Sequence, residues 1–182
     1  MPPVIETTGL DKSFGAVVAA ADINVSVDER EVVGIIGANG AGKTTFINIV
    51  TGYLKPDRGR IHYMGADITA LSPRDITRLG ISRSFQIPQL FVGLSVLDNL
   101  LVALGVAASP RQDLWRPLKR GETVEAAAHI LDRYGIAEYG AQKTALLPQG
   151  VRKLLDIAMA MIGEPKLVLL DEPTSGISVD EK

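Results

Sequence analysis

Cysteine is absent from this chain of 182 residues. Its absence excludes a disulfide framework and thiolate metal sites. Aromatic side chains make up only 5% of the residues, and the formal net charge is −2. Since the chain has no basic surplus of the kind that drives binding to phosphate backbones, we expect no nucleic-acid partner.

Long apolar runs are also missing. The N-terminal residues lack the charged start and apolar core of a signal peptide. The most apolar helical stretch, residues 94–108, contains Ser95, Asp98 and Asn99 and is shorter than the ~20 residues that a membrane span needs. We therefore expect any membrane role to come through another subunit. The chain length and the 46% of hydrophobic residues suit one globular α/β domain.

The run of residues 37–45, Gly-Ala-Asn-Gly-Ala-Gly-Lys-Thr-Thr, fits the phosphate-binding pattern G-x-x-x-x-G-K-[ST] without a mismatch. The apolar residues 32–36 before it predict a strand, and a helix is expected from Thr44. Glycines let backbone N–H groups approach phosphate oxygens. Lys43 adds a positive charge near the β- and γ-phosphates, and Thr44 can offer its hydroxyl to Mg²⁺. The pattern predicts a nucleoside triphosphate bound by Gly37, Asn39, Gly40, Ala41, Gly42, Lys43, Thr44 and Thr45.

A second motif is the apolar run 166–170, which ends in Asp171 and Glu172. This pattern indicates a buried parallel strand that brings two carboxylates to the rim of a sheet. In a P-loop ATPase, Asp171 would hold Mg²⁺ through the water shell of the metal, and Glu172 would orient or deprotonate the attacking water. Taken alone, the run would favour a simpler interpretation, a strand that merely ends on solvated charges.

The remaining pattern predicts alternating strands and helices. Short strands are expected over 4–8, 22–27 and 31–36, and further strands over 60–64 and 81–85. Helices are expected over 44–51, over a short stretch that Ser72 caps, and over 122–134 and 151–162. Ser95 and Asp98 resemble a capping box that begins the helical region after Gln86. Residues 107–123 are expected to form a loop.

Three segments in this order resemble the ATP-binding subunit of an ABC transporter: Gln86 after Ser84-Phe85, the run 147–151, and the run 169–175. The resemblance covers residues 4–182. It implies an α/β fold, a P-loop NTPase (RecA-like) core with an antiparallel β lead-in and an inserted α-helical subdomain. The implied division is 1–86 for the lead-in and P-loop half, 87–163 for the helical subdomain, and 164–182 for the acidic strand, with the core incomplete at the C-terminus.

The resemblance also implies roles for single residues. Gln86 takes the place of the glutamine that senses Mg²⁺ and the γ-phosphate, although a lone glutamine is more often just solvated. Phe14 takes the place of an aromatic that stacks on adenine, although such a residue is more often part of a core. The implied catalytic residues are Glu172, Lys43 and Gln86, and the implied metal-binding residues are Thr44, Gln86 and Asp171.

Residues 83–91 and 94–100 are similar to branched-chain amino acid importer ATPases. This resemblance implies ATP and Mg²⁺ as ligands, a second ATP-binding subunit in a homo- or heterodimer, and transmembrane permease subunits as partners. The expected location is the cytoplasmic face of the cell membrane, where the permease subunits would hold the protein.

Two departures from the family pattern leave an alternative open. The family's usual signature is Leu-Ser-Gly-Gly-Gln, and this chain has Pro148 in the position of the serine. Proline offers neither a hydroxyl nor an N–H, so Gly150 and neighbouring amides remain as donors to a nucleotide across the dimer. In the family, a switch histidine that contacts the γ-phosphate follows the acidic strand by about thirty residues, which would place it beyond Lys182. Ser178 takes the position of the family's D-loop aspartate. We therefore expect a C-terminally truncated chain.

The departures give the second hypothesis, a module that binds Mg-ATP without effective hydrolysis. A third hypothesis, an ABC-type protein acting on ribosomes or DNA, would need a tandem domain or a basic surface, and this sequence shows neither.

Overall fold

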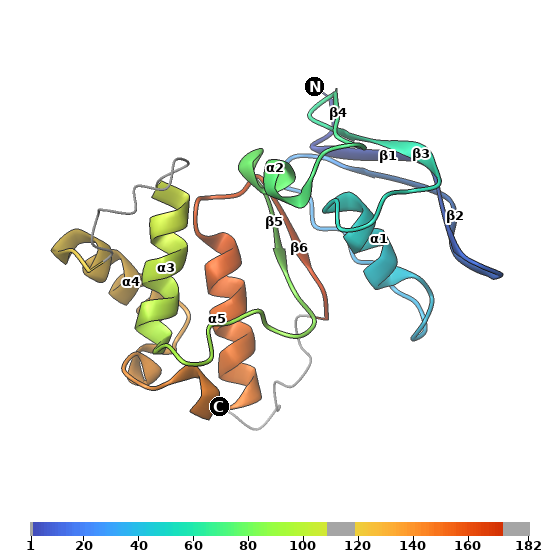
Figure 1. Cartoon of the computed structure of the whole chain (residues 1–182). Helices are drawn as coiled ribbons and strands as arrows, with labels where there is room; N and C mark the ends of the chain where they lie inside the picture. The colour runs from blue at the N-terminus through green and yellow to red at the C-terminus, as the bar shows by residue number, and fades with distance from the viewer. Residues whose placement is uncertain (1, 109–118, 173–182) are drawn as a thin grey trace. The chain divides into compact units, whose positions relative to one another are not determined.

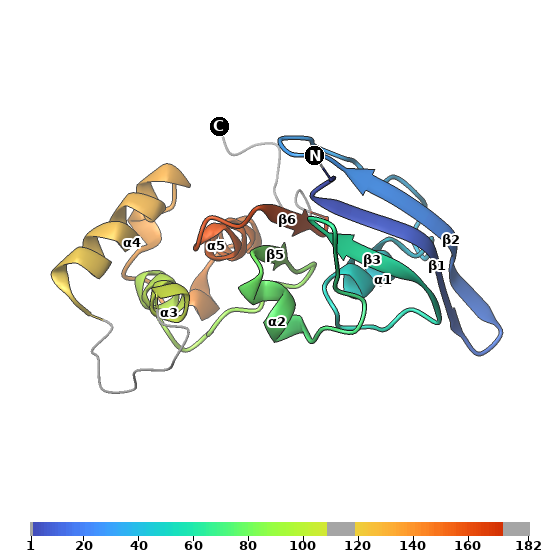
Figure 2. The ribbon, with the colours of Figure 1, turned by 90° about the horizontal axis from the view of Figure 1, so that it is seen from above.

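A computed structural model describes residues 2–108 and 119–172. The chain forms two compact units, Met1–Ser82 and Arg83–Lys182, called here the first and second unit. Each is described by itself (Figures 1 and 2). The sequence-based division into 1–86, 87–163 and 164–182 stays a prediction.

The first unit is built on an antiparallel sheet of four strands in the order β2-β1-β3-β4. Its strands are β1 (Ile5–Phe14), β2 (Val17–Val27), β3 (Arg58–Tyr63) and β4 (Ala66–Asp67). The hairpin of β1 and β2 pairs Ile5 with Val27 and Phe14 with Val17. In β1, Ile5 and Thr7 are buried while Glu6 and Thr8 are exposed, because alternate side chains of a strand face opposite sides. The expected antiparallel lead-in is confirmed.

Two helices complete the first unit. Helix α1 (Lys43–Val50) packs with β2 and buries Phe46, Ile47, Ile49 and Val50. Helix α2 (Pro73–Arg78) begins as the sequence predicts, because the Ser72 hydroxyl accepts a hydrogen bond from the Asp75 N–H at 3.3 Å.

The expected strand over residues 31–36 is wrong. Residues 31–38 have no regular secondary structure, and Val32 and Ile36 are 96% and 98% exposed. An apolar run becomes a strand only when neighbouring strands pair with its N–H and C=O groups. In the described part of the chain, none of the named strands pairs with this run.

The second unit combines three helices with a small sheet. The helices are α3 (Val96–Ala108), α4 (Gly121–Arg133) and α5 (Gln149–Met161), and short 3₁₀ turns span Ala137–Tyr139 and Thr144–Leu146. Their core consists of Val96, Leu100, Leu101, Ala127, Leu131, Ile136, Leu147, Val151, Leu155 and Ala158. Core positions three or four residues apart, such as Val96 and Leu100 in α3 or Val151, Leu155 and Ala158 in α5, lie on one face of their helix. The predicted helical region after Gln86 is confirmed.

The start of α3 is capped by Ser95, as predicted. The Ser95 hydroxyl accepts from the Asp98 N–H at 3.0 Å and donates to the Asp98 carboxylate at 2.8 Å. This hydroxyl and the Lys119 ammonium, 3.0 Å from the carboxylate, lower the pKa of Asp98. Asn99, fully buried, donates to the Thr144 hydroxyl at 3.0 Å and joins α3 to the segment before α5.

Two strands, β5 (Ile81–Ser84) and β6 (Leu167–Leu170), form the small sheet. Figure 1 shows them side by side and running in the same direction, so that Gln86 and Glu172 both follow the same end of the sheet. Residues 166–170 thus bring carboxylates to a sheet rim, as predicted. The strand is not buried, however, because Leu167, Val168 and Leu169 are half-buried and Leu170 is 42% exposed.

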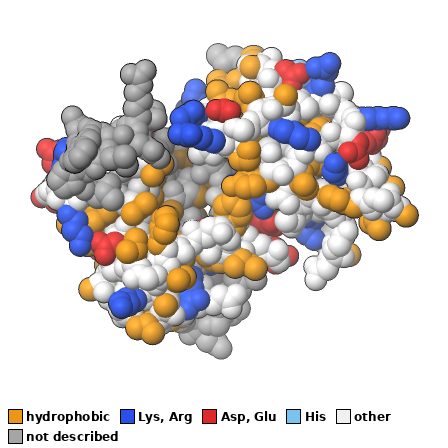
Figure 3. Space-filling model, in the orientation of Figure 1, with side chains coloured by type: hydrophobic (Ala, Val, Ile, Leu, Met, Phe, Trp, Pro, Cys, Tyr) orange, Lys and Arg blue, Asp and Glu red, His pale blue; other side chains and the backbone are white. Residues whose placement is uncertain are grey.

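The described surface mixes charges of both signs with apolar side chains, as the face in Figure 3 shows. Across residues 2–108 and 119–172, no helix has the length and apolar character needed to cross a membrane.

Candidate active site

The phosphate-binding run turns tightly before α1. Gly40 and Gly42 have φ values of 83° and 86°, a conformation that costs glycine little. Gly42 is the N-cap of α1, and an added Cβ there would lie 2.0 Å from the carbonyl oxygen of Ala19 in β2. The glycine is therefore required by a close approach of two backbones.

Lys43 lies at the first position of α1 and folds back over the run. Its ammonium donates to the carbonyl oxygens of Gly37 at 2.7 Å and Ala38 at 2.9 Å. The first turn of α1 has no acidic residue. The positive end of the helix and the lysine thus lie on the same short, exposed stretch, an arrangement that suits an anion such as a phosphate chain.

The other predicted residues of the run are accessible. Asn39, Gly40, Ala41 and Thr44 are exposed, and Thr45 is half-buried. Phe14, predicted to stack on adenine, ends β1 and is 49% exposed, and the Lys12 ammonium lies 5.7 Å from its ring centre. Phe14 is therefore not a buried core residue, although its residue type alone favours the core.

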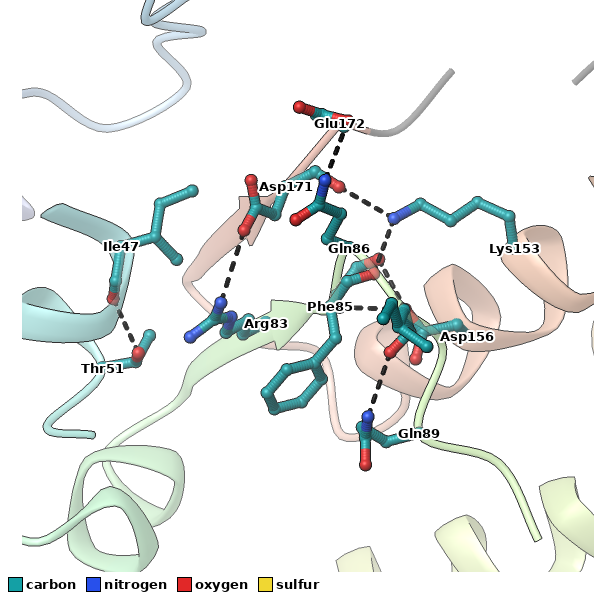
Figure 4. A network of polar contacts seen from close by, with 12 residues as sticks. Ile47, Thr51, Arg83, Phe85, Gln86, Gln89, Lys153, Asp156, Asp171 and Glu172 are labelled. Carbon is teal, nitrogen blue, oxygen red and sulfur yellow. Dashed lines mark hydrogen bonds and ion pairs between the residues drawn. The ribbon is translucent and has the colours of Figure 1, made fainter. Parts of the chain in front are cut away.

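In the second unit, the structure brings Gln86 and Glu172 together. The Gln86 side-chain amide donates to a Glu172 carboxylate oxygen at 3.2 Å (Figure 4). Both side chains are exposed. Glu172 has a φ of 47°, which is uncommon for a residue other than glycine and which it shares with Glu164 in the same unit.

Asp171, in contrast, is buried, with 3% of its surface exposed. Its carboxylate forms an ion pair with the Arg83 guanidinium at 3.4 Å. Arg83 itself stacks over the Phe85 ring, 4.6 Å from the ring centre. The predicted metal-binding carboxylate is therefore held by a cation, which sequence reasoning did not foresee.

The predicted metal-binding residues carry oxygens of the kind that Mg²⁺ prefers. Thr44, in the first unit, has a hydroxyl, and Gln86 and Asp171, in the second unit, have an amide oxygen and a carboxylate. No cluster of three or more His, Cys, Asp or Glu side chains occurs in the part of the chain that the structure describes. Such a cluster is not required, because Mg²⁺ sites of this kind use one or two carboxylates.

Gly150 lies in the first turn of α5, which begins at Gln149 after the N-cap Pro148. No side chain caps this helix, and its first turn contains no acidic residue. The predicted helix over 151–162 thus begins two residues earlier, which places Gly150 among the amides at the positive helix end.

Two charged residues of α5 were missed by sequence reasoning. Lys153 and Asp156 are 1% and 6% exposed and lie one turn apart. The Lys153 ammonium donates to the carbonyl oxygens of Phe85 at 2.7 Å and Asp171 at 2.8 Å. The Asp156 carboxylate accepts from the Ser84 hydroxyl at 2.6 Å and from the Phe85 N–H at 3.0 Å (Figure 4).

The sequence carried no signal for these residues. Lys153 lies two positions before the fully buried Leu155 and therefore on nearly the opposite side of the helix, where charged side chains are normally solvated. Buried charges are usually paired or hydrogen-bonded, so their position indicates polar groups nearby.

Comparison with known proteins gives the family. The family model described as "ABC transporter" matches residues 20–175. The chain is 36% identical to the high-affinity branched-chain amino acid transport ATP-binding protein BraF of Pseudomonas aeruginosa, across 98% of this chain and 72% of that protein. It is 37% identical to the probable branched-chain amino acid transport ATP-binding protein LivG of Methanocaldococcus jannaschii, across 96% of this chain and 70% of the relative.

Solved structures agree. An ATP-binding cassette of an ABC transporter superposes with a TM-score of 0.83 at 36% identity, over 98% of this chain and 72% of that one. A nucleotide-free cassette from an ABC transporter gives a TM-score of 0.81 at 34% identity, over 97% and 71%. These matches confirm the predicted P-loop NTPase fold, and a cassette in its ADP conformation, with a TM-score of 0.80, shows that the fold binds nucleotide. The chain belongs to the ABC transporter family, as one of its ATP-binding cassettes.

Proposed function

We propose that this chain is the ATP-hydrolysing subunit of an importer for branched-chain amino acids. The observation that carries the proposal is the identity of 36% and 37%, over nearly the whole chain, to proteins named for the transport of these solutes. The permease subunits of the importer would be its partners and would hold it at the cytoplasmic face of the membrane.

In this proposal, residues 37–45 bind the phosphates of ATP through backbone N–H groups and Lys43. The Lys43 ammonium now rests on two carbonyl oxygens of the run, which are weaker partners than an anionic phosphate. It would exchange them for phosphate oxygens when ATP binds. The exposed ring of Phe14 would stack on the adenine.

Glu172 would accept a proton from the attacking water or orient it. The hydrogen bond from Gln86 supports this role, because it restrains the exposed Glu172 side chain in one direction. Thr44, Gln86 and Asp171 would hold Mg²⁺, and the bound ion would neutralise charge on the β- and γ-phosphate oxygens. The Asp171 carboxylate would then either bind the metal while it keeps its ion pair with Arg83, or exchange Arg83 for the metal.

The protein would act as a homo- or heterodimer. The first-turn amides of α5, Gly150 included, would donate to the γ-phosphate held by the other subunit. Pro148 brings neither hydroxyl nor N–H, so the positive helix end replaces the serine of the usual signature.

The ATP-binding part is tested with Lys43→Met. The variant is expected to weaken Mg-ATP binding by about 10- to 100-fold, because it removes a charge-assisted bond to phosphate of about 1.5–3 kcal/mol. Isothermal titration calorimetry gives the affinity. Arg74→Met, which removes an exposed charge of α2 in the same unit, is the matched control and should bind ATP as the wild type does. Equal affinity in both variants would contradict the assignment of Lys43.

The solute is tested in the cells that make the protein. Deleting this chain is expected to abolish the high-affinity uptake of radiolabelled leucine, isoleucine and valine, and re-expression should restore it. Uptake of an unrelated solute such as a sugar serves as the control. Unchanged uptake of all three amino acids would show that the importer carries another solute.

A further inference from the structure

Gln86 and Glu172 each follow a residue whose backbone carbonyl is held by the same side chain. Phe85 precedes Gln86, and Asp171 precedes Glu172. The Lys153 ammonium donates to both carbonyl oxygens, at 2.7 Å and 2.8 Å. One buried cation on α5 therefore joins the peptide groups from which the two side chains start.

Asp156 completes the hold on the first of these residues. Its carboxylate accepts from the Phe85 N–H, while Lys153 takes the Phe85 carbonyl. Both backbone polar groups of Phe85 are thus bound by side chains one turn apart on α5. A segment held at both groups cannot rotate without breaking a buried hydrogen bond to a charged residue, which is costly.

The cost of keeping a lysine in this position points to a role beyond packing. Lys153 is 1% exposed, and burying an ammonium is unfavourable unless it is well hydrogen-bonded. Figure 4 shows its side chain reaching from α5 to the ends of β5 and β6, where Gln86 and Glu172 lie. An apolar residue would fill the same space without this desolvation cost.

We propose that Lys153 is a positioning residue for hydrolysis, which aligns Gln86 and Glu172 by binding the carbonyl groups of Phe85 and Asp171. The inference rests on the proposed function of Gln86 and Glu172. The run 147–151, which takes the place of the family signature, leads into α5. A shift of this helix would therefore move the Gln86 and Glu172 side chains together.

The test compares Lys153→Met with Lys153→Arg and with the control Lys143→Met, which removes an exposed lysine of the same unit. Lys153→Met keeps the length and apolar stem but no donor. It is expected to lower ATP turnover by about 10- to 100-fold, as loss of a residue that orients catalytic groups does, with ATP affinity changed less than threefold. Lys153→Arg should recover most of the turnover, and Lys143→Met should match the wild type.

A double-mutant cycle with Gln86→Ala separates positioning from mere stability. If Lys153 acts through Gln86, the double variant is expected to be no slower than the slower single variant. Multiplied effects both in this cycle and in the matching cycle with Glu172→Gln, or a loss of turnover that only follows the unfolded fraction seen by circular dichroism, would overturn the inference. If Lys153→Met does not fold, Lys153→Gln, which keeps an uncharged donor, takes its place in the cycle.

The inference and the function on which it rests fail differently. A wild-type protein that binds no Mg-ATP contradicts the proposed function, and the inference with it. A wild type that hydrolyses ATP, together with a folded Lys153→Met variant of equal turnover, contradicts the inference alone.

Discussion

Glu172→Gln is expected to reduce ATP turnover by at least about 100-fold while ATP affinity stays within about threefold of the wild type. A positioned general base contributes 10²- to 10⁴-fold to such a reaction. Glutamine keeps the shape of the side chain and an oxygen that can still accept the hydrogen bond from Gln86. The substitution therefore removes the negative charge and little else. Phosphate release under saturating Mg-ATP gives the turnover, and calorimetry gives the affinity.

The matched control is Glu164→Gln. Glu164 is exposed, lies in the same unit, and shares the unusual backbone conformation of Glu172, with a φ of 52° against 47°. Its replacement should leave turnover unchanged. A Glu172→Gln variant that turns over ATP as fast as the control would rule out Glu172 as the group that activates water. A wild type that binds ATP but releases no phosphate would instead favour the alternative of a binding module without hydrolysis.

Gly42→Ala is expected to destabilise the protein by about 2–5 kcal/mol. An alanine at φ 86° costs about 1–2 kcal/mol. The added Cβ would also lie 2.0 Å from the Ala19 carbonyl oxygen, so that the backbone of β2 or of α1 must move, at a further cost of the size seen on overpacking, about 1–3 kcal/mol. Urea denaturation followed by circular dichroism measures the loss. ATP binding should weaken as well, because the moved backbone is that of the phosphate-binding run.

Gly40→Ala separates the two causes. Gly40 has nearly the same φ, 83°, but nothing lies within 4 Å of its added Cβ. This variant should therefore lose only about 1–2 kcal/mol, the cost of the left-handed conformation. The difference between the two variants measures the close approach of α1 to β2. Equal losses at both positions would show that this approach does not restrict residue 42.

Elements governed by neighbours in the chain were predicted well. The caps at Ser72 and Ser95 were recognised because a hydroxyl binds an N–H three residues further on, so the partner lies within the motif. The strand over residues 31–36 was not, because a strand takes its hydrogen-bond partners from elsewhere in the chain. The length of β2 was underestimated for the same reason, since its first part pairs along β1 as a hairpin.

The candidate site divides along the same line. The residue types of the run 37–45 and of Asp171 and Glu172 are chemically specific, so the sequence alone indicated a nucleotide site and the ABC transporter family. The roles of these residues stay predictions that the variants above test.

The sequence by itself determined the glycine-rich run, the helix caps and the order of motifs. The groups that interact in each of these motifs lie within a few residues of one another in the chain. Only the tertiary structure decided that Gln86 contacts Glu172 across 86 residues of chain, that Arg83 pairs with Asp171, and that Lys153 and Asp156 are buried. The physical reason is that a side chain's residue type sets which bonds it can make. The packing of distant segments sets which partner it meets, and whether its charge leaves water.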